Sequence, residues 1–195
     1  SLKNKIVGED YKTKIMKISK YLNKNKSDFL FITAPENIAW LLNIRGHDNP
    51  NSPIPNCQLI INNKNNFYLI AYKNKVSKLI REKKIKSEQA IEPKNFSKFI
   101  SNLKGKKIII DKNSCSIFFE NILKKKFKIL SVEDPIYLFK SLKNKTEIRS
   151  MIKAHIFDGV ALTKFIYWIK NINKKTITEF EAQNKLENFR KKNKD

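Results

Sequence analysis

Short apolar runs alternate with amphipathic stretches between residues 28 and 131 of the chain. Continuous apolar runs bounded by turn-forming residues are typical of buried strands, and they stand at 28–33, 57–62, 67–72, 107–111 and 127–131, with a weaker one at 89–91. Apolar residues at helical spacing or helix-start signals predict helices at 10–24, 35–43, 74–84, 93–103 and 116–126.

This order of elements predicts the α/β class, with a β-sheet sandwiched between helices. The strands at 57–62 and 67–72 are separated only by the polar run 63–66, "NKNN", which predicts a hairpin. Strands joined by a tight turn run antiparallel, so we expect a mixed sheet rather than a purely parallel one.

The pattern changes after Pro135, because residues 143–173 carry no strand signal. An apolar helical face is predicted instead, and it consists of Ile148, Met151, Ile152, His155, Gly159, Leu162, Ile166 and Ile169. Asn144 followed by Glu147 predicts a capping box at the start of this helix. A second helix is predicted to start with a capping box of Thr176 and Glu179 and to continue its apolar stripe through Leu186 and Phe189.

We therefore expect two domains, residues 1–139 and residues 140–195, with the boundary in the segment 134–144. Two helices cannot bury an apolar stripe of this size between them. We expect residues 145–195 either to fold back on the α/β domain or to associate with a second copy of the chain, and self-association is the favoured outcome.

Composition narrows the class of protein. Hydrophobic residues make up 41% of the 195 residues, which is enough for a real core. No run approaches the roughly 18 apolar residues that a membrane span needs, so we expect no membrane partner. Cys57 and Cys115 are too few for a disulfide framework and lack metal-ligand spacing, which favours two buried thiols in a cytoplasmic protein.

A net charge of +23 is typical of proteins that bind nucleic acids, but the kinds of basic residue in this chain argue against such binding. Only 4 of the 41 basic residues are Arg, and the 37 Lys are spread along the chain together with 23 Asn and 28 Ile. These residues share A/T-rich codons, whereas readers of bases and phosphates favour the Arg fork. We expect no specific nucleic-acid partner. A basic RNA-binding domain is an alternative that rests on the net charge alone.

The rare residues of the chain gather in one segment, Glu36–Asn56, which includes Trp40, Arg45, Gly46 and His47. A second combination is His155 with Asp158 on one helical face, which could form a metal or proton-relay pair, although a structural role is the simpler interpretation. A hydrolytic metal centre needs several converging His, Asp and Glu residues, and the sequence offers no such set. From these residues we predict no catalytic and no metal-binding residue in this chain.

Two segments resemble the Xaa-Pro aminopeptidase (aminopeptidase P) family. The first is Trp40-Leu41-Leu42-Asn43-Ile44-Arg45-Gly46, followed by Asp48 and Pro53, and it resembles the middle domain of the three-domain members. The second comprises Lys140, Lys143-Asn144, Glu147-Ile148 and the run Ala154–Leu162, and it resembles the entry into the catalytic domain, with the next helix ending in Phe189-Arg190. Both motifs stand in family order, and the resemblance covers nearly the whole chain.

The resemblance implies a creatinase N-terminal-like α/β domain followed by a two-helix stub of an α+β "pita-bread" metallopeptidase domain. It implies that the intact enzyme releases the N-terminal residue from peptide substrates with Pro in second position, using two divalent metal ions, Mn or Zn. The family's metal ligands follow the Phe-Arg helix, so this chain is expected to be a fragment that is inactive and binds no cofactor by itself. The alternative is a non-catalytic creatinase-fold module that binds peptides or proteins.

The resemblance also suggests roles for the rare residues. Arg45, His47 and Asp48 are candidates for contacts with a catalytic cleft or a neighbouring domain. An alternative for Arg45 is a structural ion pair with Asp48. Trp40, Gly46, His155 and Asp158 are expected to be structural, and Gly46 is expected to permit a turn with positive φ.

Overall fold

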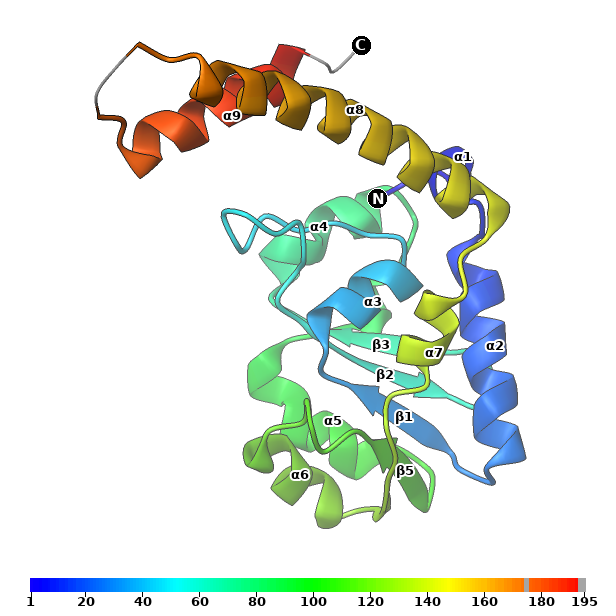
Figure 1. Cartoon of the computed structure of the whole chain (residues 1–195). Coiled ribbons are helices and arrows are strands. Elements are labelled where there is room, and N and C mark those ends of the chain that lie inside the picture. The colour runs from blue at the N-terminus through cyan, green and yellow to red at the C-terminus, as the bar shows by residue number, and fades with distance from the viewer. Residues whose placement is uncertain (174–175, 193–195) are drawn as a thin grey trace. The chain divides into compact units, whose positions relative to one another are not determined.

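The computed structural model describes residues 1–173 and 176–192 (Figure 1). The chain divides into two compact units, Ser1–Lys143 and Asn144–Asp195. Among the described residues, no helix combines the length and apolar character that crossing a membrane requires.

The first unit contains a six-stranded sheet in the order β4–β3–β2–β1–β5–β6. Its strands are β1 (Phe29–Ile32), β2 (Gln58–Asn62), β3 (Phe67–Ile70), β4 (Ala90–Ile91), β5 (Lys107–Ile110) and β6 (Lys128–Ser131). The pairs β1–β2 and β2–β3 are antiparallel, whereas β1–β5, β3–β4 and β5–β6 are parallel. The predicted mixed sheet, including the hairpin of β2 and β3, is confirmed.

Helices cover both faces of this sheet (Figure 1). One face packs against α2 (Tyr11–Lys24), α3 (Pro35–Leu41), α4 (Lys73–Arg81) and α7 (Ile136–Ser141), and the other against α5 (Phe96–Asn102) and α6 (Ile117–Lys124). In β1, Leu30 and Ile32 face the first layer, and Phe29 and Phe31 face the second. Each such buried side chain stabilises the fold by about 1.5–3 kcal/mol.

The predicted helices and strands of this unit are present, with shifts of a few residues at their ends. The helix predicted at 93–103 begins with the 3₁₀ turn Pro93–Asn95 and continues as α5. Three short elements were not predicted: α1 (Asn4–Val7), the 3₁₀ turn Ser87–Gln89, and α7. They are too short to show a helical period in the sequence.

The second unit is a pair of helices, α8 (Lys145–Lys170) and α9 (Glu179–Lys192). The capping box of α8 is confirmed, since the Asn144 side chain accepts hydrogen bonds from the N–H groups of Thr146 and Glu147, and Glu147 Oε2 accepts from Asn144 N at 2.8 Å. The capping box predicted for α9 is wrong by two residues. Thr178, not Thr176, is the cap: its Oγ1 accepts from Glu181 N at 3.2 Å, and its N–H donates to Glu181 Oε2 at 3.0 Å.

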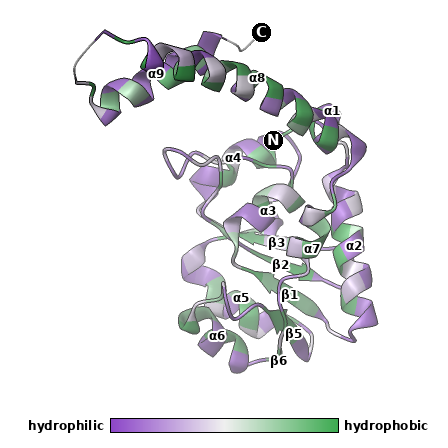
Figure 2. Cartoon of the chain, in the orientation of Figure 1, coloured by the Kyte–Doolittle hydropathy of each residue, from purple (hydrophilic) through white to green (hydrophobic). Residues whose placement is uncertain are grey.

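Two sides of α8 have different surroundings. The side toward α9 carries Ala161, which is fully buried, and Trp168, whose ring lies 5.2 Å from Lys185 Nζ of α9. The apolar face predicted from the sequence is exposed instead, with Ile152 at 57% and Leu162 at 42% relative accessibility. Apolar residues recur along the whole length of α8 (Figure 2). The helix therefore carries more apolar surface than α9 covers.

Candidate binding pocket

The segment that follows α3 is anchored by a buried turn. Asn43 has a positive φ of 52° and is almost fully buried. Its Oδ1 accepts a hydrogen bond from Lys14 Nζ at 2.8 Å, and its Nδ2 donates to the carbonyl of Glu9 at the same distance. Asn tolerates this left-handed conformation better than most residues. The turn thus fixes the direction in which the chain leaves α3.

Lys14 is the buried partner of this turn, with 1% relative accessibility. Its Nζ also donates to the Trp40 carbonyl at 2.8 Å and lies 3.9 Å from the centroid of the Trp40 ring. A cation near the last carbonyls of a helix and over an aromatic face is stabilised by both. Trp40 is partly buried and packs against both the hydrophobic core and the Lys14 side chain.

Gly46 is required by close packing rather than by its backbone angle. Its φ is not positive, so the expected positive-φ turn is wrong. A Cβ at this position would lie 2.6 Å from Pro55 Cα and 2.9 Å from the Ile54 carbonyl carbon. The two arms of the loop are also joined by the hydrogen bond from Gly46 N to the Pro53 carbonyl at 3.0 Å. The prolines and the glycine therefore make one closely packed turn.

Asp48 is held by two donors. Its Oδ2 accepts from Asn56 N at 2.7 Å, and its Oδ1 pairs with Lys75 Nζ of α4 at 2.9 Å. These bonds hold the pKa of the Asp48 carboxyl below its usual value. The structural ion pair of Asp48 with Arg45 is not formed, because Arg45 Nη1 donates to the Ile44 carbonyl at 2.8 Å instead.

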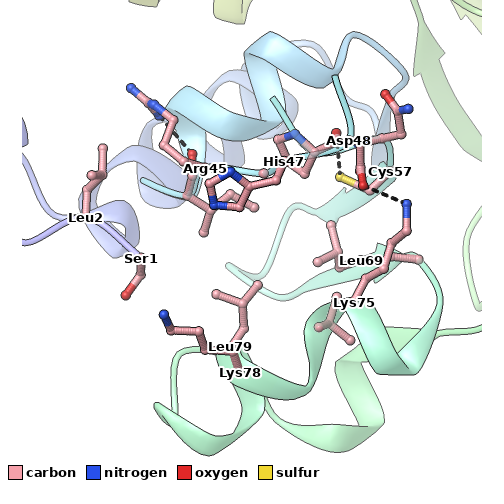
Figure 3. Close-up of a pocket in the computed structure, with 16 residues that line it drawn as sticks. Ser1, Leu2, Arg45, His47, Asp48, Cys57, Leu69, Lys75, Lys78 and Leu79 are labelled. Carbon is pink, nitrogen blue, oxygen red and sulfur yellow. Dashed lines mark hydrogen bonds and ion pairs between the residues drawn. The ribbon is translucent and has the colours of Figure 1, made fainter. Parts of the chain in front are cut away.

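These residues form the wall of a pocket of about 380 Å³ between the loop, α4 and the first residues of the chain (Figure 3). Buried apolar side chains form its floor, among them Leu69, Ala71 and Val76. The ionisable side chains that line it are Arg45, His47, Asp48, Lys75 and Lys78. Arg45 and His47 are exposed, and Asp48 is half-buried. The predicted cluster of Arg45, His47 and Asp48 thus surrounds a real cavity, whereas its role in a cleft or between domains stays a prediction.

The pocket has no reactive thiol. Cys57 lines it, but burial raises the pKa of the Cys57 thiol to about 12, so the thiol is protonated at neutral pH. Cys115, on the other face of the sheet, is also buried, and its thiol pKa is raised to about 11, again mainly by burial. Both cysteines are free, as expected from the sequence.

His155 and Asp158 lie on α8 in the second unit. The Nδ1 atom of His155 lies 2.8 Å from the Met151 carbonyl, one turn back on the same helix. Asp158 Oδ1 accepts from Arg190 Nε of α9 at 2.7 Å, and this pair lowers the pKa of the Asp158 carboxyl. Asp158 therefore joins the two helices. In the described part of the chain, no three His, Cys, Asp or Glu side chains converge on a metal-sized site.

A buried polar network in the first unit escaped the sequence analysis. Asn37 Nδ2 donates to Asp134 Oδ2 at 2.8 Å, and Lys140 Nζ donates to Asn37 Oδ1 at 2.6 Å. Burial raises the pKa of the Asp134 carboxyl. The network joins α3 to α7. The only indication of it in the sequence is the position of Asn37 on the buried face of a predicted helix.

Known proteins resemble the chain over its full length. The model of the creatinase/prolidase N-terminal domain matches residues 1–147. Xaa-Pro aminopeptidase 1 of Dictyostelium discoideum is 30% identical over 210 residues, which cover 100% of this chain and 32% of the relative. A probable Xaa-Pro aminopeptidase P of Paracoccidioides brasiliensis (strain Pb03) is 32% identical and covers 96% of this chain and 33% of its own length.

Among solved structures, the X-prolyl aminopeptidase of Caenorhabditis elegans, a cytosolic enzyme with a di-nuclear active site, superposes with a TM-score of 0.82 at 19% identity. The match covers 97% of this chain and 32% of that enzyme. The likeness confirms the predicted creatinase N-terminal-like fold. The chain spans about a third of the length of the curated relatives it matches.

Proposed function

Because the chain belongs to the creatinase/prolidase N-terminal domain family, we propose that it is part of a metal-dependent Xaa-Pro aminopeptidase. The whole protein would release the N-terminal residue from peptides with Pro in second position. The observation that carries this proposal is the alignment of the entire chain with one third of Xaa-Pro aminopeptidase 1. Residues 1–139 would form the creatinase N-terminal-like domain, and residues 140–195 the first helices of a pita-bread domain.

The described residues do not fit a pair of divalent metal ions, since no group of three candidate ligands converges among them. We therefore assign the metal ligands and the chemistry to parts of the protein outside this chain. The 195-residue chain by itself is proposed to be inactive. The role of this chain in the enzyme would be structural. The free thiols and the cytosolic relative support a cytoplasmic location.

The test compares the protein made from the complete reading frame with residues 1–195, both supplied with Mn²⁺. We expect the complete protein to cleave a Gly-Pro peptide and to spare the matched Gly-Ala peptide, while the 195-residue chain cleaves neither. Cleavage by the 195-residue chain would contradict the assignment of the metal site. A complete protein without activity and without metal would favour the alternative, a non-catalytic module that binds peptides.

A further inference from the structure

We propose that the pocket beside His47 binds a small monocarboxylate with an aliphatic body, such as the C-terminal residue of a peptide. The pocket lies wholly within the first unit and needs no metal ion. The proposal does not depend on the proposed aminopeptidase activity.

The size and floor of the pocket suit an aliphatic group. Its volume of about 380 Å³ lies in the range of small-molecule sites, which are mostly apolar with a few polar groups that fix orientation. Leu69, Ala71 and Val76 make the floor, and Leu79 of α4 completes it. A branched aliphatic side chain that packs on these residues would be removed from contact with water.

The mouth of the pocket suits a negative charge. Three cationic side chains, Arg45, Lys75 and Lys78, line the pocket against one carboxylate, that of Asp48. Both oxygens of Asp48 already accept hydrogen bonds, so this carboxylate is not a site for a cationic ligand. The charge of Lys75 is neutralised by its ion pair with Asp48. Lys78 and His47 carry the donors that remain at the mouth (Figure 3).

Arg45 contributes from the outer side of the loop. One of its N–H groups donates to the Ile44 carbonyl, and a guanidinium has five donors in all. Arg45 is exposed, and its guanidinium points away from Asp48 and Lys75 (Figure 3), so it adds positive charge beside the pocket. A carboxylate in the pocket would receive charge-assisted hydrogen bonds from Lys78, which are stronger than neutral ones.

A monocarboxylate fits better than a phosphate. The ionised Asp48 stands in the same wall, and its pKa is lowered, so it keeps its negative charge at neutral pH. This charge offsets part of the cationic charge of the wall, so the preference over phosphate rests on the apolar floor. A phosphate has no aliphatic part to cover Leu69 and Val76.

The chain offers a direct measurement, because its two imidazoles lie in different units: His47 lines the pocket, and His155 lies on α8. We would titrate the 195-residue chain with N-acetyl-leucine in 150 mM salt and follow the ring C–H signals of both residues by NMR. The neutral analogue N-acetyl-leucinamide has the same shape without the charge, and acetate and phosphate have the charge without the aliphatic body.

We expect N-acetyl-leucine to shift the His47 signals in a saturable way and to leave those of His155 in place. The leucinamide, acetate and phosphate should each bind at least several-fold more weakly. Equal effects of the acid and the amide would overturn carboxylate recognition. Equal effects of N-acetyl-leucine and acetate or phosphate, or equal shifts at His155, would reduce the observation to general adhesion of anions to a basic protein.

Matched variants on α4 complete the test. Lys78→Gln removes a cation from the pocket, whereas Lys73→Gln removes one from the same helix outside it. Both side chains are exposed, so neither change should unfold the protein. We expect Lys78→Gln to weaken binding of N-acetyl-leucine about 1.5- to 5-fold, the usual range for an exposed charge pair. If Lys73→Gln weakens binding as much, net charge rather than the pocket governs it and the proposal is wrong.

Discussion

At the scale of single residues, Gly46 and Gly159 have opposite surroundings. A Cβ at Gly46 would meet the backbone of Pro55 at 2.6 Å, whereas a Cβ at Gly159 on α8 would meet nothing within 4 Å. We expect Gly46→Ala to destabilise the first unit by about 1–3 kcal/mol, because backbone cannot yield as a side chain can. Gly159→Ala should instead stabilise its helix by up to about 1 kcal/mol.

Urea unfolding followed by circular dichroism measures both changes. If Gly46→Ala and the wild type have equal free energies of unfolding, the loop can shift to accommodate the added Cβ without loss of stability. In that case the packing of the prolines against Gly46 would not explain the glycine.

Lys14 provides a second prediction at this scale. Lys14→Met should cost about 1–3 kcal/mol, because the change leaves the buried Asn43 Oδ1 without the Lys14 donor and removes the Lys14 hydrogen bond to the Trp40 carbonyl. Lys20→Met alters an exposed lysine of the same helix and should stay within about 0.5 kcal/mol of the wild type. Chemical denaturation of the two variants decides, and similar losses in both would mean that Lys14 acts through helix propensity or net charge.

The sequence identified the loop around Arg45 by its rare residues, but it could not identify the neighbours of those residues. Lys14 is one lysine among 37, and nothing in its local pattern separates it from the exposed ones. The sequence suggested Arg45 as the ion-pair partner of Asp48, whereas the actual partner, Lys75, lies 27 positions away. Such choices depend on the tertiary fold, which brings α4 beside the loop.

At the scale of elements, the start of α9 can be tested with two threonines. Both Thr176 and Thr178 are followed by Glu three positions later, so the sequence supports either capping box. The hydrogen bonds of Thr178 with Glu181 predict that Thr178→Ala costs about 1 kcal/mol of helix stability, while Thr176→Ala has little effect. Amide hydrogen exchange of residues 181–184 reports fraying of the first turn, and greater fraying in the Thr176 variant would contradict the assignment.

The link between the loop and α4 should depend on pH. The pKa of Asp48 is lowered in the folded protein by Lys75 and Asn56, so its contribution is present above the unfolded value of about 3.9 and is lost as the pH falls through the folded value. Asp48→Asn should therefore be less stable than the wild type at pH 7, by about 0.5–1 kcal/mol. The two proteins should become equal in stability at low pH.

Stability curves between pH 2 and pH 7 test this dependence. Lys75→Gln should reproduce the loss of the ion pair, and the double variant should lose less than the sum of the two single losses. Strict additivity would show that the two side chains do not interact.

Element type was predictable wherever a segment was long enough to show its period. The strands β1, β2, β3 and β5 are continuous apolar runs because helices cover both faces of the sheet. The helix α7 was missed because it has six residues and holds its place through Asp134 and Lys140, which contact Asn37 of a distant helix.

At the scale of the whole molecule, the exposed apolar face of α8 predicts self-association. Large side chains such as Ile152 and Ile156 are 57% and 60% exposed, and burying a side chain of this kind gains about 1.5–3 kcal/mol. We expect residues 1–195 to associate with increasing concentration and residues 1–143 to remain monomeric in static light scattering. A monomeric 195-residue chain at high concentration would contradict this prediction, and Ile152→Lys is the variant that should weaken association.

The sheet order has a consequence for synthesis on the ribosome. The central strand β1 pairs with β2 on one side, about 30 positions along the chain, and with β5 on the other, with Phe29 opposite Ile108. The β4–β3–β2–β1 half can therefore assemble before β5 emerges, since its pairings are closer in sequence. Until β5, α6 and β6 follow, β1 presents an unpaired edge, Phe29 lacks its neighbour Phe127, and Phe31 lacks its neighbour Phe119. The nascent chain is most prone to aggregate in this interval.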